Sequence, residues 1–192
     1  MHPDFDAFNY FCRNCDRPMK ENSPIVYIAV LVVILIAAGV SVLKEVIKTR
    51  KLEGALARLT EKLKDGDGTA AEHYELGSVY LDKKLFTQAI PQFQKAIKKR
   101  ELEGADVAAV YNALGYAHFA QEQYDLAVRH YKDALKNYPD YVVALNNLGH
   151  VYEKKSLTTK AIEAYDQSLA IEPENETAKL RSESLKKRVA PV

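Results

Sequence analysis

The stretch YNALGYAHFAQEQYDLAVRHYKDALKNYP, residues 111–139, decides the fold, because its pattern occurs twice more in the chain. The segment LNNLGHVYEKKSLTTKAIEAYDQSLAIEP (145–173) aligns with it at an offset of 34 residues, and HYELGSVYLDKKLFTQAIPQFQKAI (73–97) precedes it by 38. The four extra residues of the longer interval fall in RELEGAD (100–106). A period of this length indicates helical repeats that stack on their neighbours.

Each copy carries the same small and aromatic residues in the same order. A Leu-Gly pair comes early, an alanine follows, an aromatic residue comes four positions later, and a proline closes two of the three copies. This order is the tetratricopeptide-repeat (TPR) signature, in which paired antiparallel helices approach closely at the small residues and the aromatic rings fill the space between repeats. The residues are Leu76-Gly77, Leu114-Gly115 and Leu148-Gly149, then Ala89, Ala127 and Ala161, then Phe93, Tyr131 and Tyr165, then Pro139 and Pro173, with Glu101 in place of the first proline.

The predicted fold class is all-α, a three-repeat TPR α-solenoid that follows one N-terminal transmembrane helix. No repeat buries its apolar face alone, so the last one needs a polar capping helix, for which ENETAKLRSESLKKR (174–188) is suited. TAAE (69–72) predicts a capping box at the start of the first repeat. The predicted domains are a leader at 1–24, a transmembrane helix at 25–43, an amphipathic linker helix and turn at 44–68, TPR repeats at 70–103, 108–141 and 142–175, and the capping helix at 176–188.

The predicted span, IVYIAVLVVILIAAGVSVL (25–43), carries no charge over 19 positions. In a helix this run rises about 28 Å, close to the ~30 Å hydrocarbon thickness of a bilayer. It exceeds the apolar core of about 7–15 residues that is usual for a signal peptide. An uncleaved anchor is therefore favoured over a cleaved signal peptide.

Charges beside the span predict its orientation. Lys44, Lys48, Arg50 and Lys51 follow it with Glu45 as the only acid, whereas three cations precede it among four acids. Lys and Arg near a span stay on the cytoplasmic or stromal side. The repeats are therefore predicted on that side and the N-terminus on the opposite one.

Four leucines between the span and the repeats lie on one helical face. Leu52, Leu56, Leu59 and Leu63 are spaced by four, three and four positions. The helix is therefore predicted to continue from the span and to stop at the turn DGDG (65–68).

Composition and motifs exclude several classes of function. The 27 Lys and Arg nearly balance the 26 Asp and Glu, and a net charge of +1 gives no basic field for nucleic acid. No catalytic constellation, phosphate-binding loop or dinucleotide fingerprint occurs, so neither an enzyme nor a small-molecule substrate is predicted. His73 and His118 occupy positions usually held by aromatic residues, which predicts that they pack in the core.

Six residues of the inner helices are predicted to face the concave groove of the solenoid. Asparagine at equivalent positions of successive repeats can bond both N–H and C=O of an extended peptide, while aromatic rings contact its side chains. A merely solvated face is the alternative. The carboxylate clamp of chaperone-tail binding repeats is absent, since Tyr74 and Ser78 stand where Lys and Asn would be required. The candidate partner-binding residues are Tyr74, Ser78, Asn112, Tyr116, Asn146 and His150.

The leader contains the one reactive motif, CRNC (12–15), with both cysteines of the chain. A C-x-x-C pair is half a zinc site or a dithiol. Zinc at Cys12 and Cys15 would need further ligands from His2, Asp16, a second protomer or a partner. Zinc, a redox pair and two small residues without further role stay open, and no other cofactor is predicted.

The chain resembles the photosystem I assembly family of cyanobacteria and plastids known as hypothetical chloroplast reading frame 37. Four segments carry the resemblance: NSPIVYIAVLVVILIAAGVSVLKEVIKTRK (22–51), YELGSVYLDKKLFTQAI (74–90), YNALGYAHFAQEQYDLAV (111–128) and ALNNLGHVYEKK (144–155). The likeness covers about residues 22–188. It implies a thylakoid protein with stromal repeats and a lumenal N-terminus. The implied partners are photosystem I core subunits and other assembly factors, without catalysis.

Three functions from different classes therefore compete. The first is the membrane-anchored assembly scaffold. The second is a bacterial membrane-anchored TPR chaperone for exported proteins, which would hold its repeats outside the cytoplasm. The third is a thiol enzyme acting through Cys12 and Cys15. The cations that follow the span favour the first.

Overall fold

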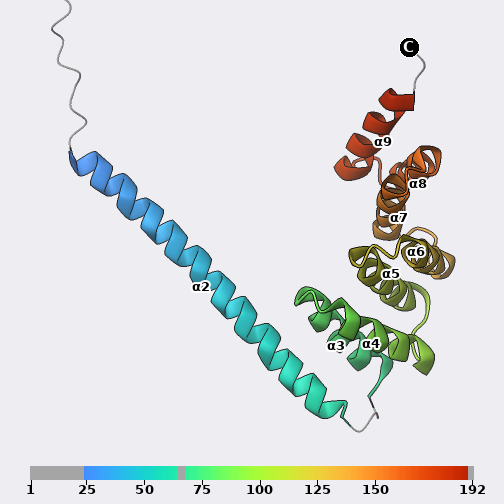
Figure 1. The fold of residues 1–192 in the computed structure, drawn as a ribbon, viewed down its shortest axis with the longest axis horizontal. Coiled ribbons are helices and arrows are strands. Elements are labelled where there is room, and N and C mark those ends of the chain that lie inside the picture. Colours follow the sequence, from blue (N-terminus) through green and yellow to red (C-terminus); the bar gives the residue numbers. More distant parts are fainter. Residues whose placement is uncertain (1–23, 65–67, 190–192) are drawn as a thin grey trace, which may run out of the picture. The chain divides into compact units, whose positions relative to one another are not determined.

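The computed structural model describes residues 24–64 and 68–189 (Figure 1). Within these ranges the structure has eight helices and no strand, so the predicted all-α class is confirmed. The chain divides into two compact units, Met1–Arg50 and Lys51–Val192. The helices are α2 (Pro24–Lys62), α3 (Ala70–Asp82), α4 (Phe86–Lys99), α5 (Gly104–Ala120), α6 (Tyr124–Asn137), α7 (Val142–Lys154), α8 (Thr158–Ile171) and α9 (Glu176–Val189).

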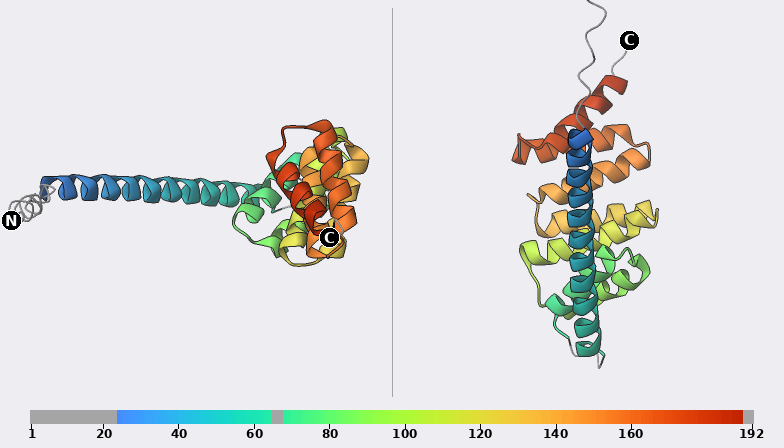
Figure 2. Two further views of the ribbon diagram at one scale, coloured as in Figure 1. Left: turned by 90° about the horizontal axis from the view of Figure 1, so that it is seen from above. Right: turned by 90° about the vertical axis from the view of Figure 1, so that its left-hand side faces the viewer.

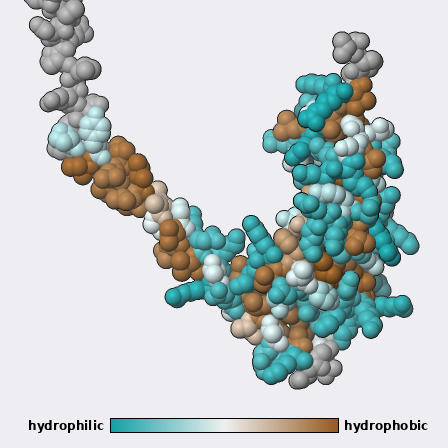
Figure 3. Space-filling view, viewed as in Figure 1, coloured by the Kyte–Doolittle hydropathy of each residue, from teal (hydrophilic) through white to brown (hydrophobic). Residues whose placement is uncertain are grey.

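Helix α2 is the one described helix that is long and apolar enough to cross a membrane, judged by length and composition. Its most apolar 18-residue window has a mean hydropathy of 2.5, and none of that window is buried inside the protein. Figure 3 shows these apolar side chains along the N-terminal part of the helix. Large side chains such as Val33 and Leu35, 65% and 61% exposed, are unfavourable in water and favourable in lipid.

The C-terminal part of α2 belongs to the second unit and packs against α3. Leu59 and Leu63 are buried in one cluster with Leu76 and Val79. The helix runs without interruption to Lys62. The prediction that it continues from the span and carries a leucine face is therefore confirmed.

Helices α3 to α8 form three antiparallel pairs, and α9 packs on the last of them (Figure 2). In each pair the glycine of the Leu-Gly motif lies directly against the aromatic ring of the second helix. A Cβ atom added to that glycine would lie closer to the ring than real side-chain atoms approach, so no larger residue fits without displacing the ring. The separations would be 2.6 Å for Gly77 and Phe93, 2.8 Å for Gly115 and Tyr131, and 2.8 Å for Gly149 and Tyr165.

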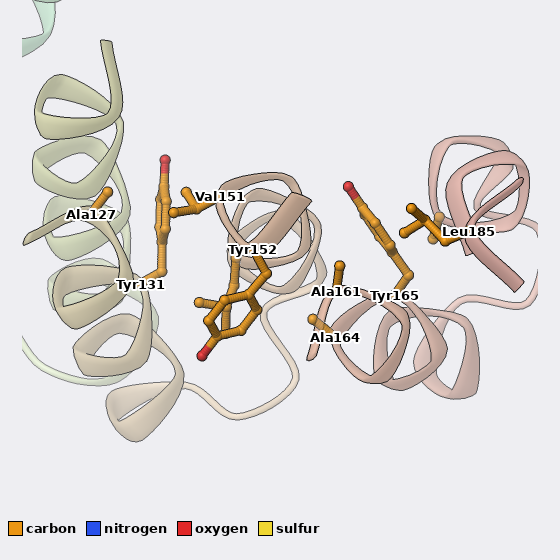
Figure 4. Close-up of a cluster of buried hydrophobic side chains, with 10 residues drawn as sticks. Ala127, Tyr131, Val151, Tyr152, Ala161, Ala164, Tyr165 and Leu185 are labelled. Atoms are coloured by element: carbon orange, nitrogen blue, oxygen red, sulfur yellow. The ribbon is translucent and has the colours of Figure 1, made fainter. Parts of the chain in front are cut away.

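The same rings reach the following repeat. Tyr131 lies against Val151, and Tyr165 lies against Leu185 of α9 (Figure 4). Both tyrosines are only 1% exposed. The prediction that aromatic rings fill the space between repeats is confirmed, and the structure adds their contact with the glycine of their own repeat.

The four extra residues of the first interval form one additional helical turn. Helix α5 has 17 residues, whereas α3 and α7 have 13 each. It begins at Gly104, four positions before Ala108, the equivalent of Ala70 and Val142 that begin α3 and α7. Because four residues are close to one turn of 3.6, the insertion lengthens the helix and leaves its buried face nearly aligned.

The N-terminus of α3 is capped twice. The predicted capping box is confirmed, with the Glu72 N–H donating to Thr69 Oγ1 at 3.3 Å and the Thr69 N–H donating to Glu72 Oε2 at 3.0 Å. In addition, the Ala70 N–H donates to Glu101 Oε2 at 2.7 Å. The residue that replaces the first repeat's closing proline therefore holds the start of the same repeat.

Candidate functional site: the inner face of the repeats

Four of the six predicted groove residues line one pocket between α3 and α5. Tyr74 and Ser78 come from α3, and Asn112 and Tyr116 come from α5. In each helix the two positions are four apart, so their side chains lie one above the other on the same face. The pocket has a volume of about 250 Å³ and is also lined by Leu81, Asp82, Ala113 and Asn147.

The pocket keeps part of its hydrogen-bonding capacity free. Asn147 Nδ2 donates to Asn112 Oδ1 at 2.9 Å, which orients both amides. Within the described residues, Asn112 Nδ2 and Asn147 Oδ1 have no hydrogen-bond partner. One donor and one acceptor, the pair that a peptide group needs, are therefore available next to each other.

The aromatic residues of the pocket differ in how firmly they are held. The Tyr74 ring is half-buried, with its centroid 6.0 Å from that of Phe93. The Tyr116 ring meets Phe86 edge-on at 6.5 Å and is 42% exposed. Tyr116 therefore has the larger surface to offer a partner side chain.

The other two predicted groove residues, Asn146 and His150, do not line this pocket. Asn146 Nδ2 donates to Asn175 Oδ1 at 3.4 Å, and Asn175 Oδ1 also accepts from the Ala178 N–H at the start of α9. The His150 ring lies 4.9 Å from that of Phe119, and burial lowers the pKa of this histidine, assisted by the positive charge of Arg181. A partner-binding role for all six residues stays a prediction.

Asn147 was missed by the sequence prediction. It stands one position after Asn146, and the equivalent residue in the preceding repeat is Ala113. A search for the same residue type at equivalent positions of successive repeats therefore does not find Asn147. The paired asparagines of NNLGH (146–150) were the available signal.

The charge of the pocket is set by Asp82, the only ionised side chain among its described lining residues. No Lys or Arg occurs among these described lining residues, so they form no clamp for a terminal carboxylate. Its chemistry suits a neutral or basic extended segment.

The histidines predicted to pack in the core do so. His73 is 1% exposed and His118 is 6% exposed. The ring of His118 also stacks on that of His130 at 5.2 Å, which was not predicted. Burial, followed by the charge of His118, lowers the pKa of His130.

The candidate zinc ligands Cys12 and Cys15, with His2 and Asp16, lie outside the described residues. Among residues 24–64 and 68–189, no three His, Cys, Asp or Glu side chains gather in an arrangement that could hold a metal ion.

Stacked antiparallel helix pairs with a glycine under an aromatic ring define the chain as a TPR solenoid, a repeat scaffold for protein–protein interaction. Two family models, each described as a tetratricopeptide repeat, match residues 68–140 and 112–176. The crystal structure of MamA superposes with a TM-score of 0.67 at 25% identity, covering 73% of this chain and 80% of that one.

Comparison with curated sequences identifies the family. The uncharacterized protein ycf37 of Cyanophora paradoxa is 37% identical over 153 residues, covering 80% of this chain and 89% of that protein. The chain belongs to the ycf37 family of TPR proteins, as its sequence resemblance implied. The chloroplastic TPR domain-containing protein PYG7 of Arabidopsis thaliana is 36% identical over 163 residues, 85% of this chain but 54% of that longer protein.

Proposed function

We propose that the protein is a membrane-anchored TPR scaffold that binds photosystem I subunits or other assembly factors and assists photosystem I assembly. The observation that carries the binding role is the pocket between α3 and α5, where a free amide donor, a free amide acceptor and two tyrosines meet. Membership of the ycf37 family, together with the likeness to the chloroplastic protein PYG7, supports the photosynthetic setting.

The pocket suits an extended peptide segment. Its volume of about 250 Å³ accommodates a side chain or two, so the remainder of a ligand would continue along the inner face. Asn112 and Asn147 would bond the peptide backbone, and Tyr116 would pack against a side chain. Asp82 would favour a segment without acidic residues at that point.

The apolar part of α2 would anchor this scaffold in the thylakoid membrane. The cations that follow the span favour repeats on the stromal side and an N-terminus in the lumen. Removing residues 1–44 should therefore release a helical domain that no longer sediments with membranes, whereas high salt or alkaline carbonate should leave the intact chain in place.

Capture of partners from mildly solubilised thylakoid membranes tests the binding role. The tagged chain should retain photosystem I core subunits or assembly factors, and Tyr116→Ala should reduce their recovery several-fold. Tyr138→Ala is the matched control, because Tyr138 is 40% exposed, close to the 42% of Tyr116, and does not line the pocket. Equal recovery with both variants would contradict a role for this pocket.

A topology measurement separates the scaffold from a chaperone for exported proteins. Both natural cysteines precede the span, so a membrane-impermeant thiol reagent reports on the N-terminal side. A Cys12→Ser, Cys15→Ser, Glu183→Cys variant reports on the repeats, because Glu183 is exposed on α9. If the reagent added on the stromal or cytoplasmic side labels position 183 and not the natural cysteines, the scaffold is supported. If it labels the natural cysteines and not position 183, the chaperone is supported.

A further inference from the structure

The end of α4 carries a group of cations that the inner-face pocket does not use. The run KAIKKR (95–100) places four positive charges in six residues. All four side chains are exposed, and none forms an ion pair with any other described residue. We call this surface the basic edge; it consists of Lys95, Lys98, Lys99 and Arg100.

A small cavity opens between the lysines of the basic edge. It has a volume of about 330 Å³ and is lined by His73 with Lys95, Lys98 and Lys99. Most of its wall consists of carbon atoms, because the lysine stems line it while their charged ends reach water. His73 is held from behind by Gln92, whose Oε1 lies 3.0 Å from His73 Nδ1.

A larger cavity adjoins it through Lys98, which lines both. This second cavity has a volume of about 750 Å³ and combines apolar side chains with cations. Among the described residues, Glu103 is the only acid that lines either cavity. The lining residues of the larger one are Ile97, Lys98, Arg100, Leu102, Glu103, Gly104, Val107, Tyr111 and Asn137.

The larger cavity depends on the four extra residues between the first repeat and the second. Arg100 turns the chain out of α4 in the left-handed conformation, with φ of 55°. Gly104 and Val107, from the additional turn of α5, form part of the wall. The basic charges are also particular to this repeat, because the equivalents of Lys95, Lys99 and Arg100 in the next repeat are Asp133, Asn137 and Tyr138.

We propose that the basic edge is a second interaction surface, separate from the inner-face pocket, that binds an acidic segment of a partner protein. Carboxylates of that segment would lie at the lysine ammonium groups, and an aliphatic or aromatic side chain between them would enter the larger cavity. Four unpaired cations around apolar walls match both properties of such a segment. A phosphate-bearing partner would match the charges but leave the apolar walls without a counterpart.

A synthetic peptide tests this proposal on the full chain in phosphatidylcholine nanodiscs. The probe is a fluorescein-labelled peptide in which Asp and Glu flank Leu and Phe, and the matched probe replaces every acid by its amide. Fluorescence anisotropy should show binding of the acidic peptide and at least tenfold weaker binding of the amide peptide. Failure of the acidic peptide to bind, or equal binding of the two, would overturn the proposal.

The chain offers a matched pair of variants. Lys98 and Lys136 are exposed residues at equivalent positions, in the last turns of α4 and α6, so Lys98→Glu and Lys136→Glu change the net charge equally. Lys98→Glu should weaken binding about tenfold, and Lys136→Glu should leave it within about twofold. Lys95→Glu, at the smaller cavity, should weaken it several-fold as an independent check. Equal losses for Lys98→Glu and Lys136→Glu would indicate a general charge effect and overturn the proposal.

Competing partners are tested on the same samples. Short-chain phosphatidylglycerol and a 20-nucleotide single-stranded DNA serve as probes for lipid headgroups and nucleic acid. If either binds in a way that requires Lys98 while the acidic peptide does not bind, the basic edge belongs to a phosphate-bearing partner and the proposal is wrong. Wild-type helicity and melting of the exposed-site variants, measured by circular dichroism, ensure that lost binding reports on the surface.

Discussion

The buried contact between glycine and aromatic ring is nearly the same in all three repeats, whereas the inner face of the solenoid changes from one repeat to the next. The contact leaves room for no side chain at any of the three glycines. A residue enclosed in this way can change only with its neighbours, while a residue on an open face is free to suit a partner. The two inner-face positions hold Tyr74, Asn112 and Asn146, and Ser78, Tyr116 and His150, in successive repeats.

Enlarging a buried alanine should give the largest loss of stability. Ala127 is fully buried in the cluster around Tyr131, so Ala127→Trp should lower the free energy of unfolding by about 3 kcal/mol or more through overpacking. The melting temperature, followed by circular dichroism, should fall by roughly 6–12 °C. Leu126→Trp is the control, since Leu126 is 40% exposed and should tolerate the ring within about 0.5 kcal/mol. Similar melting of the two variants would show that the repeats pack more loosely than described.

Adding one methyl group at the repeated contact should give an intermediate loss with an informative sign. Alanine normally favours a helix over glycine by about 1 kcal/mol, but at Gly115 its Cβ would lie 2.8 Å from the Tyr131 ring. We expect Gly115→Ala to lose about 1–2 kcal/mol net. Gly54→Ala should gain about 0.5–1 kcal/mol, because Gly54 lies in a helix with nothing within 4 Å of the added atom. A gain in stability at both positions, measured by thermal melting, would contradict the proposed close contact between Gly115 and the Tyr131 ring.

Acidification should weaken the second repeat by a smaller amount. His130 lies against His118 and Tyr111, with Arg129 and Asp133 as its charged neighbours, and the net effect of burial and like charge lowers its pKa. When the pKa of a histidine is lowered in the folded state, the unfolded chain is protonated at a higher pH than the folded protein. The contribution of the neutral histidine to stability is therefore fully present above about pH 6.5 and is lost as the pH falls.

The melting temperature should therefore decrease from pH 7.5 to pH 5.5, because the free energy of unfolding falls by at most about 1.4 kcal/mol per pH unit for each proton taken up on unfolding. His130→Gln should reduce the slope, and His150 accounts for part of the remainder because its pKa is lowered as well. A melting temperature that rises on acidification would contradict this sign.

Truncating the exposed tyrosine of the pocket should have the smallest effect on stability. Tyr116→Ala should change the free energy of unfolding by less than about 0.5 kcal/mol, because its ring is 42% exposed. The same variant is expected to lose partner capture. Tyr116→Ala should therefore weaken binding while leaving the melting temperature nearly unchanged, whereas Ala127→Trp should lower the melting temperature itself. If Tyr116→Ala melts early and still captures partners normally, the inner face is structural.

Prediction from the sequence succeeded where the signal is local or periodic. Thr69 and Glu72 are three residues apart, and their capping box forms from that spacing alone. The pairs Tyr74 with Ser78 and Asn112 with Tyr116 each lie one turn apart, so a common face follows from helix geometry. That each pair shares one helix face was therefore predictable without a structure, and the partner-binding role of the four residues stays a prediction.

Other parts of the site depend on packing between distant segments. The bond from Asn147 to Asn112 joins residues 35 positions apart and breaks the repeat pattern. Asn146, at a regular position, instead contacts Asn175 ahead of α9. Which asparagine reaches the pocket depends on how neighbouring helices are rotated against each other, and repeat spacing carries no information about that.

The sequence by itself determined the helices, their number of repeats, the apolar span and the small and aromatic residues of each contact, because these follow from a backbone period of 3.6 residues and from local hydropathy. Only the tertiary structure decided that the four inserted residues lengthen α5, that Glu101 caps α3, and that four inner-face residues share a pocket while two do not. The tertiary structure also determined the cavities at the basic edge. Their shape depends on the spacing between α4 and α5, which buried side chains set across the repeat and which no short stretch of sequence encodes.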